Sequence, residues 1–363
     1  MTAGLPRALV LLLGTASAVI TVAGLRSVAW LVTPILLALI IVIVVSPAHN
    51  RLRRIGFPSW AATLVMVLLV YGTLVAFAIV TFVSIAQLAA TLPRYADRVG
   101  GIVHDVSVVL GRFGVSPGEV RDALSGLDFG RILPYVGSIV RDLTGLTTSL
   151  VFLLALLLFL SMEATGVDVR LTEIGGDRPH ISVALRSFAR KTRSYLIVTT
   201  VFGFVIAVFD SVALALLGIP LPVLWGLLSF VTNYIPNIGF LMGLIPPAAL
   251  ALLAGGWQLM LVVILIYWAV NFVVQSLIQP IYVGDSVGLS SVMAFVSLVF
   301  WAWVLGPLGA LLAIPVTLLV MALLVDIDPQ ARWAGALLRA PDRPARKRPF
   351  SRSKTERTAP WPP

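Results

Sequence analysis

The sequence contains no cysteine, which excludes disulfide bonds, thiol catalysis and thiolate metal sites. It has only three histidines (His49, His104 and His180), far apart and outside the apolar runs, and the His-Glu-x-x-His spacing of a metal-binding helix is absent. A Gly-x-Ser-x-Gly motif and a phosphate-binding glycine-rich loop are also missing. We therefore expect a protein that is not an enzyme, does not hydrolyse ATP and needs no metal or other cofactor.

Charge is also scarce. Charged residues make up 12% of the 363 positions and hydrophobic residues 59%, whereas soluble domains carry about 25% charge. Several windows exceed the roughly 18 apolar residues that mark a membrane helix. The composition predicts an all-α, polytopic helical membrane protein whose surroundings are the lipid bilayer.

The net charge of +10 is better explained by topology than by nucleic-acid binding, which we do not expect. Short loops rich in Lys and Arg stay in the cytoplasm. One such loop, with Arg51, Arg53 and Arg54, follows Pro47, and a basic, proline-rich tail ends the chain. Both termini are therefore expected to be cytoplasmic.

The distribution of apolar and charged residues divides the chain into five parts. They are 1–84, three membrane spans with a basic cytoplasmic loop; 85–145, an extracytoplasmic insert of amphipathic helices; 146–194, a fourth span and a cytoplasmic loop; 195–327, a core with broken helices; and 328–363, a basic, disordered cytoplasmic tail.

The core is almost wholly apolar, yet proline, glycine, asparagine and glutamine interrupt it repeatedly. In hydrocarbon, backbone groups freed by such breaks survive only where protein or a wet cavity covers them, and many transporters build their sites from broken helices. Residues 222–254 and 287–325 each form either a re-entrant hairpin or two full spans. We interpret 195–327 as the transport core.

Pro236 marks the first break, because proline lacks a donor and disfavours helix at the residue before it. Asn233 and Asn237 flank this bend and either cap the freed carbonyls or contact a polar solute. Gly239 and Gly243 form a Gly-x-x-x-Gly spacing, which lets helices approach closely. We include Gly239 with the bend among the pathway candidates.

Three amides, Asn271, Gln275 and Gln279, recur at four-residue spacing and so share one face of an otherwise apolar helix. Such a face is expected to point to a cavity or a neighbouring helix. Interhelical hydrogen bonds in bilayers contribute only about 0.6 kcal/mol on average. We therefore favour a polar lining of a transport pathway over a role in stability alone.

Asp210 is the one acidic residue inside the fifth apolar span. An ionised carboxylate near the bilayer centre costs roughly 2.5–3.5 kcal/mol. The residue is therefore protonated, paired with a cation, or close to the outer interface. It is a candidate proton or cation site.

A set of motifs in fixed order resembles one known family. The motifs are Tyr234-Ile235-Pro236-Asn237-Ile238-Gly239, Tyr267-Trp268, Pro280-Ile281-Tyr282-Val283-Gly284, Ser286-Val287-Gly288-Leu289 and Gly306-Pro307-Leu308-Gly309-Ala310-Leu311-Leu312-Ala313-Ile314-Pro315. Together they resemble the autoinducer-2 exporter (AI-2E) family, also called PerM-like permeases. The resemblance implies a bacterial inner-membrane transporter with about eight membrane segments, forming a homo-oligomer. Members resemble exporters of a small polar signal or other solutes, and some resemble sodium/proton antiporters.

The sequence departs from the family pattern at two places. In the family that it resembles, many members carry a glutamate where this chain has Val274, which puts cation coupling through that position in doubt. A Gly-Gly pair is replaced by Phe300-Trp301-Ala302-Trp303.

The expected function is secondary transport, exporting a small polar solute such as an autoinducer-2-like signal or another metabolite. A cation/proton antiporter or a passive oligomeric channel would use the same broken helices. A membrane scaffold that transports nothing is a further alternative.

Overall fold

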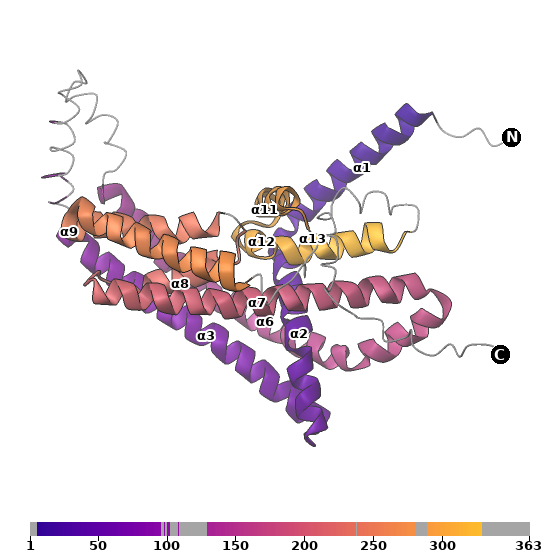
Figure 1. The fold of residues 1–363 in the computed structure, drawn as a ribbon. Helices are drawn as coiled ribbons and strands as arrows, with labels where there is room; N and C mark the ends of the chain where they lie inside the picture. Colours follow the sequence, from indigo (N-terminus) through magenta and orange to yellow (C-terminus); the bar gives the residue numbers. More distant parts are fainter. Residues whose placement is uncertain are drawn as a thin grey trace, which may run out of the picture.

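The computed structural model describes residues 6–95, 129–236, 238–279 and 289–328, together with positions 98, 100, 101 and 108. The regular elements of this part of the chain are helices (Figure 1). They are α1 (Arg7–Ser27), α2 (Ala29–Arg54), α3 (Ser59–Thr91), η1 (Leu92–Tyr95), α6 (Phe129–Asp177), α7 (Pro179–Leu216), α8 (Pro222–Thr232), α9 (Gly239–Asn271), η3 (Phe272–Ile278), α11 (Ser291–Leu305), α12 (Pro307–Leu311), α13 (Ala313–Met321) and η4 (Ala322–Asp326).

Several of these helices are long and apolar enough to cross a bilayer. Among the described residues, α2, α3 and α7 qualify, and the stretch Gly239–Ile278 qualifies by length and composition although it is broken at Gly255–Gly256. A bent pair within α6, Leu150–Ala164 and Gly166–Asp177, makes a fifth candidate. Shorter apolar helices accompany them in α1, α8, α11 and Ala313–Asp326. The predicted all-α polytopic fold is confirmed, whereas the number of membrane segments is not fixed at eight by these lengths.

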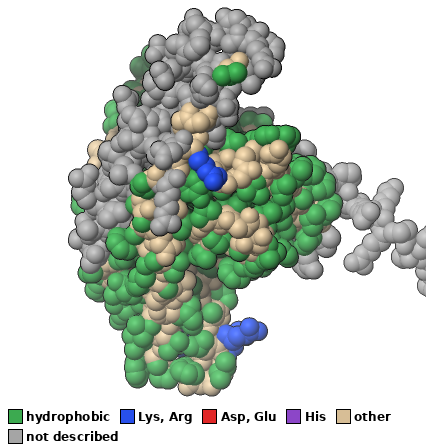
Figure 2. Space-filling view, turned by 90° about the vertical axis from the view of Figure 1, so that its left-hand side faces the viewer, with side chains coloured by type: hydrophobic (Ala, Val, Ile, Leu, Met, Phe, Trp, Pro, Cys, Tyr) green, Lys and Arg blue, Asp and Glu red, His purple; other side chains and the backbone are tan. Residues whose placement is uncertain are grey.

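Much of the protein surface is apolar, as a membrane protein requires. In Figure 2, the described part of the face shown carries mainly hydrophobic side chains and few basic ones. Side chains as large as Trp30, Phe159 and Leu216 are each more than two-thirds exposed. Surfaces of this kind are stable in hydrocarbon rather than in water.

Helix boundaries differ from those expected at the two predicted cytoplasmic loops, the one after Pro47 and the one within 146–194. The α2 helix continues through Pro47 to Arg54, and α6 and α7 extend as helices through residues 163–194. Pro47 has no N–H for the carbonyl of Ile43, four residues earlier. Arg193 of α7 supplies a replacement, because its Nε donates to Ile43 O at 3.2 Å and its Nη2 donates to Ser46 Oγ at 3.2 Å. The proline break in α2 is therefore stabilised by α7.

The predicted insert and tail are described only at their edges. Residues 85–91 belong to α3 and 129–145 to α6. Most of 96–128, and the tail beyond residue 328, lie outside the described residues. Arg98 is an exception, since its Nη1 donates to the carbonyls of Leu253 and Ala254 at 2.9 and 2.7 Å.

The stretch from Gly239 to Asn271 is a helical hairpin and not one straight span. Gly255 and Gly256 leave helical geometry (φ −142°, ψ 15° and φ 80°, ψ −174°), and the second pair of angles is open essentially to glycine alone. Leu244 in the first half packs in one cluster with Val263 and Tyr267 in the second half. The two halves of α9 therefore lie side by side.

A second bend joins α8 to α9 across residues 233–238, which contain Pro236. With 11 residues at 1.5 Å each, α8 is about 16 Å long and does not cross hydrocarbon about 30 Å thick. A Cβ added at Gly239 would overlap the carbonyl oxygen of Thr232. The glycine thus permits α8 and the first half of α9 to pack against each other directly after the bend.

The last helices form a third hairpin, closed at Gly306 (φ 74°). Trp301 of α11 donates from Nε1 to Thr317 Oγ1 of α13 at 2.9 Å, in the buried interior. The aromatic cluster noted in the sequence thus includes one tryptophan that fixes the two arms of this hairpin.

The helix α7 lies at the centre of the molecule, in contact with α2, α6, α8, α9 and α13. Two of the larger apolar clusters include residues of α7, one through Leu196 with α11 and α13, and the other through Leu214 with α8 and α9. It is therefore the scaffold against which the broken helices pack.

Candidate functional site

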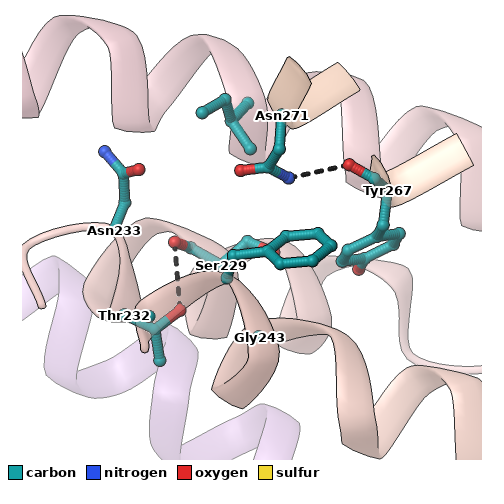
Figure 3. Close-up of a pocket in the computed structure, with 9 residues that line it drawn as sticks. Ser229, Thr232, Asn233, Gly243, Tyr267 and Asn271 are labelled. Atoms are coloured by element: carbon teal, nitrogen blue, oxygen red, sulfur yellow. Dashed lines mark hydrogen bonds between the residues drawn. The ribbon is translucent and has the colours of Figure 1, made fainter. Parts of the chain in front are cut away.

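The polar residues of the broken half gather where α7, α8, α9 and η3 meet. A small pocket lies there (Figure 3), lined by Ile206, Ser229, Thr232, Asn233, Gly239, Phe240, Gly243, Tyr267 and Asn271. It offers about 10 Å³ to the centre of a water-sized molecule, which is room for about one water. In this structure the pocket is therefore too small for a solute larger than water.

Three amide side chains form a connected group, which we call the amide cluster: Asn233, Asn271 and Gln275. The Nε2 of Gln275 donates to Asn233 Oδ1 and to Asn271 Oδ1, both at 3.0 Å. Asn233 is the residue that ends α8, and its Nδ2 donates to Thr199 O of α7 at 3.2 Å. The amide cluster thus links α7, the end of α8 and the end of α9.

The segment that carries Gln275 is a π-helix, η3. Single turns of π-helix inside α-helices are rare and frequent at functional sites, and their wider turn changes which side chains share a face. Val274 is buried, Gln275 is exposed, and Gln279 is the half-buried residue that ends η3. Of the three predicted amides, Asn271 lines the pocket, and Gln275 is joined to it by a hydrogen bond.

Small residues allow the helices to approach closely at this site. A Cβ at Gly203 of α7 would lie 2.7 Å from Asn233 Nδ2. One at Gly243 would lie 3.0 Å from Thr232 Oγ1 and 3.3 Å from Ser229 Oγ. The Gly239 and Gly243 pair thus contacts α8, which agrees with a packing role for the Gly-x-x-x-Gly spacing.

A second group of polar residues lies one helical turn before the amide cluster on α8 and α9. It consists of Asp210 of α7, Ser229 of α8 and Tyr267 of α9, and we call it the carboxyl group site. Asp210 is fully buried, and Ser229 Oγ donates to its Oδ2 at 2.8 Å. The other carboxyl oxygen, Oδ1, and the hydroxyl of the buried Tyr267 have no hydrogen-bond partner. Groups of this kind are rare in proteins and need an explanation.

The sequence leaves open whether Asp210 is protonated, paired with a cation or close to the outer interface, and its position in α7 bears on this choice. It lies about 9 Å before the end of the helix at Leu216, at 1.5 Å per residue. From Ser211 to Gly284 the chain contains no Asp, Glu, Lys, Arg or His. The α8 and α9 helices therefore bring no counter-charge to this carboxyl.

Two tyrosines brace the bend next to the site. The hydroxyl of Tyr195 on α7 donates to Tyr234 O at 3.1 Å, and Thr200 Oγ1 and the Tyr234 hydroxyl share a hydrogen bond of 2.7 Å. Both tie the bend after α8 to α7.

Of the predicted site residues, the structure brings together Asn233, Gly239, Asn271 and Gln275. Pro236 lies half-buried in the bend without lining the pocket. Asp210 does not line the pocket but accepts a hydrogen bond from Ser229, which does. Asn237 lies outside the described residues.

Sequence reasoning missed Ser229, Thr232 and Tyr267. A signal was present for two of them, Tyr267 and Ser229. Tyr267 stands four residues before Asn271, so it extends the amide pattern by one turn, and Ser229 stands four residues before Asn233. Polar residues at this spacing share a helix face.

Metal binding finds no support in the same region. Among the described residues, no group of three His, Cys, Asp or Glu side chains is placed to hold a metal ion. The site is instead built from neutral amides and hydroxyls with one buried carboxyl.

Comparison with known proteins gives the family. The sequence profile described as "AI-2E family transporter" matches residues 10–327. The AI-2 transport protein TqsA of Escherichia coli is 27% identical over 302 residues, which cover 83% of this chain and 88% of TqsA.

Two other relatives are similar in sequence to this chain along most of its length. A putative transport protein of Haemophilus influenzae is 28% identical over 330 residues, covering 89% of this chain and 94% of its own length. The putative transport protein YhhT of E. coli is 26% identical over 308 residues, with 85% and 88% covered. With the profile match and the apolar helices, these relatives show that this chain belongs to the AI-2E family of transporters and is a multi-pass membrane protein.

Proposed function

We propose that the protein is a secondary transporter that exports a small polar solute through the break between α8 and α9. The observation that carries the proposal is the amide of Gln275, which is exposed and bonds to both Asn233 and Asn271. A solute hydroxyl offers the same donors and acceptors as an amide. It can therefore replace either hydrogen bond without leaving a polar group unpaired.

The chemistry of the amide cluster indicates the class of solute. Asparagine and glutamine side chains both donate and accept, and no charged residue occurs from Ser211 to Gly284. A neutral solute with several hydroxyl or carbonyl groups fits these partners better than an ion does. The relative TqsA bears the name AI-2 transport protein, and an autoinducer-2-like signal or another small metabolite is the cargo we propose.

Transport requires that the closed pocket open to each side in turn. The backbone is not continuously helical at 233–238, which borders the pocket, and at Gly255–Gly256, the turn at the far end of the α9 hairpin. Such breaks let half-helices move while α7 remains fixed. We place both termini in the cytoplasm of a bacterial inner membrane, on the strength of the basic loop and tail, and we propose a homo-oligomer.

The experiment is flux into proteoliposomes containing the purified full chain. The probes are radiolabelled neutral polyols and sugars, charged metabolites, and Na⁺, each under imposed proton and sodium gradients. Gradient-dependent flux of a neutral polyhydroxylated probe supports the proposal. Flux of cations alone would support a cation/proton antiporter, for which the buried Asp210 is the favouring observation.

Two other outcomes would overturn the proposal. Flux that follows the solute gradient alone, and is unchanged when the ion gradients collapse, would identify a passive channel. Absence of any flux would favour a membrane scaffold that does not transport.

A further inference from the structure

Asp210 is the only fully buried acidic side chain among the described residues. It accepts one hydrogen bond, from Ser229, and its Oδ1 has none. An ionised carboxylate in apolar surroundings needs a compensating charge or several donors. The side chains of α3, α8, α9 and η3 include no charged group, and Tyr267 is the titratable residue that faces Asp210 from α9.

We propose that Asp210 binds a proton that is exchanged during transport. The hydroxyl of Ser229 donates to Asp210 in both protonation states, and the hydroxyl of Tyr267 donates to it only when Asp210 is ionised. This rests on the proposed function as a coupled transporter and names its coupling ion. The protonated acid is neutral, so it can stay buried with one hydrogen bond. The ionised form requires a second donor, and the unpartnered hydroxyl of Tyr267 can turn to provide it.

A proton suits this site better than a metal cation. Sodium or calcium ions are held by several oxygen ligands, and Ca²⁺ takes six to eight of them. The carboxyl group site offers the two oxygens of Asp210, one of Ser229 and one of Tyr267. The neighbouring pocket has room for about one water, which suffices to accept or deliver a proton.

The carboxyl group site and the amide cluster are mechanically connected. Ser229 precedes Asn233 by one helical turn on α8, and Tyr267 precedes Asn271 by one turn on α9. Figure 3 shows these four residues around the same pocket. A change in the partner of Asp210 therefore moves α8 or α9 at the position where the amide cluster would bind the solute.

The Asp210 acid passes its proton through the hydroxyl of Ser229, which lines the pocket, to a water molecule there, and the water leaves as hydronium. The carboxylate then accepts from Ser229 Oγ–H and from Tyr267 Oη–H, and reprotonation from the other side of the membrane releases the Tyr267 contact.

The test is a pH titration of the purified full-length protein followed by infrared difference spectroscopy, which needs no solute. We expect a band from the C=O stretch of a buried, protonated carboxylic acid that is lost in Asp210→Asn. In Tyr267→Phe the band should persist to higher pH, because the second donor to the carboxylate is gone. The control is Asp326→Asn, at the half-buried end of η4, which should leave the band in place.

A spectrum that is the same in wild type and Asp210→Asn would overturn the proposal. A midpoint that does not move in Tyr267→Phe would overturn the role of the tyrosine. A second measurement tests coupling, with a neutral probe that wild type transports: the imposed proton gradient should drive flux in wild type and not in Asp210→Asn. If wild type shows no flux, the proposed function fails, whereas the infrared result still decides whether Asp210 binds a proton.

Discussion

Gln275 donates a hydrogen bond of 3.0 Å to Asn233, which lies 42 residues earlier in the chain. This contact joins the residue that ends α8 to the π-helical segment after α9, so two interruptions of helix meet at one amide pair. Because Gln275 is exposed while Asn233 is half-buried, the pair lies at the boundary between the protein interior and its surroundings.

Replacing Gln275 with leucine should reduce flux of a transported neutral probe at least tenfold without affecting membrane insertion. Leucine has a similar size but can donate to neither Asn233 nor Asn271, and it presents no partner to a solute. The measurement is initial flux per inserted protein in proteoliposomes.

The matched control is Gln258→Leu, which alters an exposed glutamine next to the α9 turn, far from the amide cluster. It should transport like wild type. Equal flux in both variants would contradict a role for Gln275 in the pathway.

Arg193→Leu should lower the free energy of unfolding by about 1–3 kcal/mol, because the carbonyl of Ile43 loses its charged donor. In a Pro47→Ala background the same change should cost less, since the new N–H at position 47 can bond to Ile43 O. Chemical denaturation of the four proteins in detergent gives this double-mutant cycle. Equal costs in the two backgrounds would show that Arg193 does not serve the proline break.

Gly256→Ala should destabilise the protein by about 1–3 kcal/mol, because φ 80° with ψ −174° is a conformation that only glycine adopts without strain. Thermal unfolding in detergent is the measurement. Gly72→Ala is the control, since Gly72 lies inside α3 with nothing within 4 Å of the added Cβ, and it should be neutral or stabilising. A wild-type melting temperature for Gly256→Ala would argue against the hairpin turn.

Tyr267→Phe should leave the stability unchanged or raise it by about 1 kcal/mol, because a buried hydroxyl without a partner contributes nothing and costs its desolvation. Flux driven by a proton gradient should nevertheless fall. Stability and transport are measured on the same preparation. A large loss of stability would mean that the hydroxyl has a structural partner and is not kept for proton exchange.

The sequence predicted those features that depend on local chemistry. The apolar runs predict membrane helices, and the break around Pro236 follows from the missing N–H of proline. The spacing of Asn271 and Gln275 predicts a shared face, and the two are hydrogen-bonded to each other. The AI-2E family motifs give the family.

Features that depend on tertiary contacts could not be predicted. The π-helical form of η3, for example, has no reliable sequence signal. The partner of Asp210 is Ser229, 19 residues away on another helix, and only the packing of α7 against α8 brings them together. The contact of Arg193 with Ile43 likewise depends on how α2 and α7 cross.

The central claim is that the amide cluster lines a water-filled path at some stage of transport. Because the natural sequence has no cysteine, a single cysteine introduced at Gln275 can be probed with a charged, membrane-impermeant thiol reagent applied from either side of sealed vesicles. The matched control is a cysteine at Leu277, which is also exposed, at 53%, on the same segment. The account predicts that the cysteine at position 275 reacts from both sides and the cysteine at 277 from neither. A cysteine at 275 that is as unreactive as the one at 277 from both sides would contradict it.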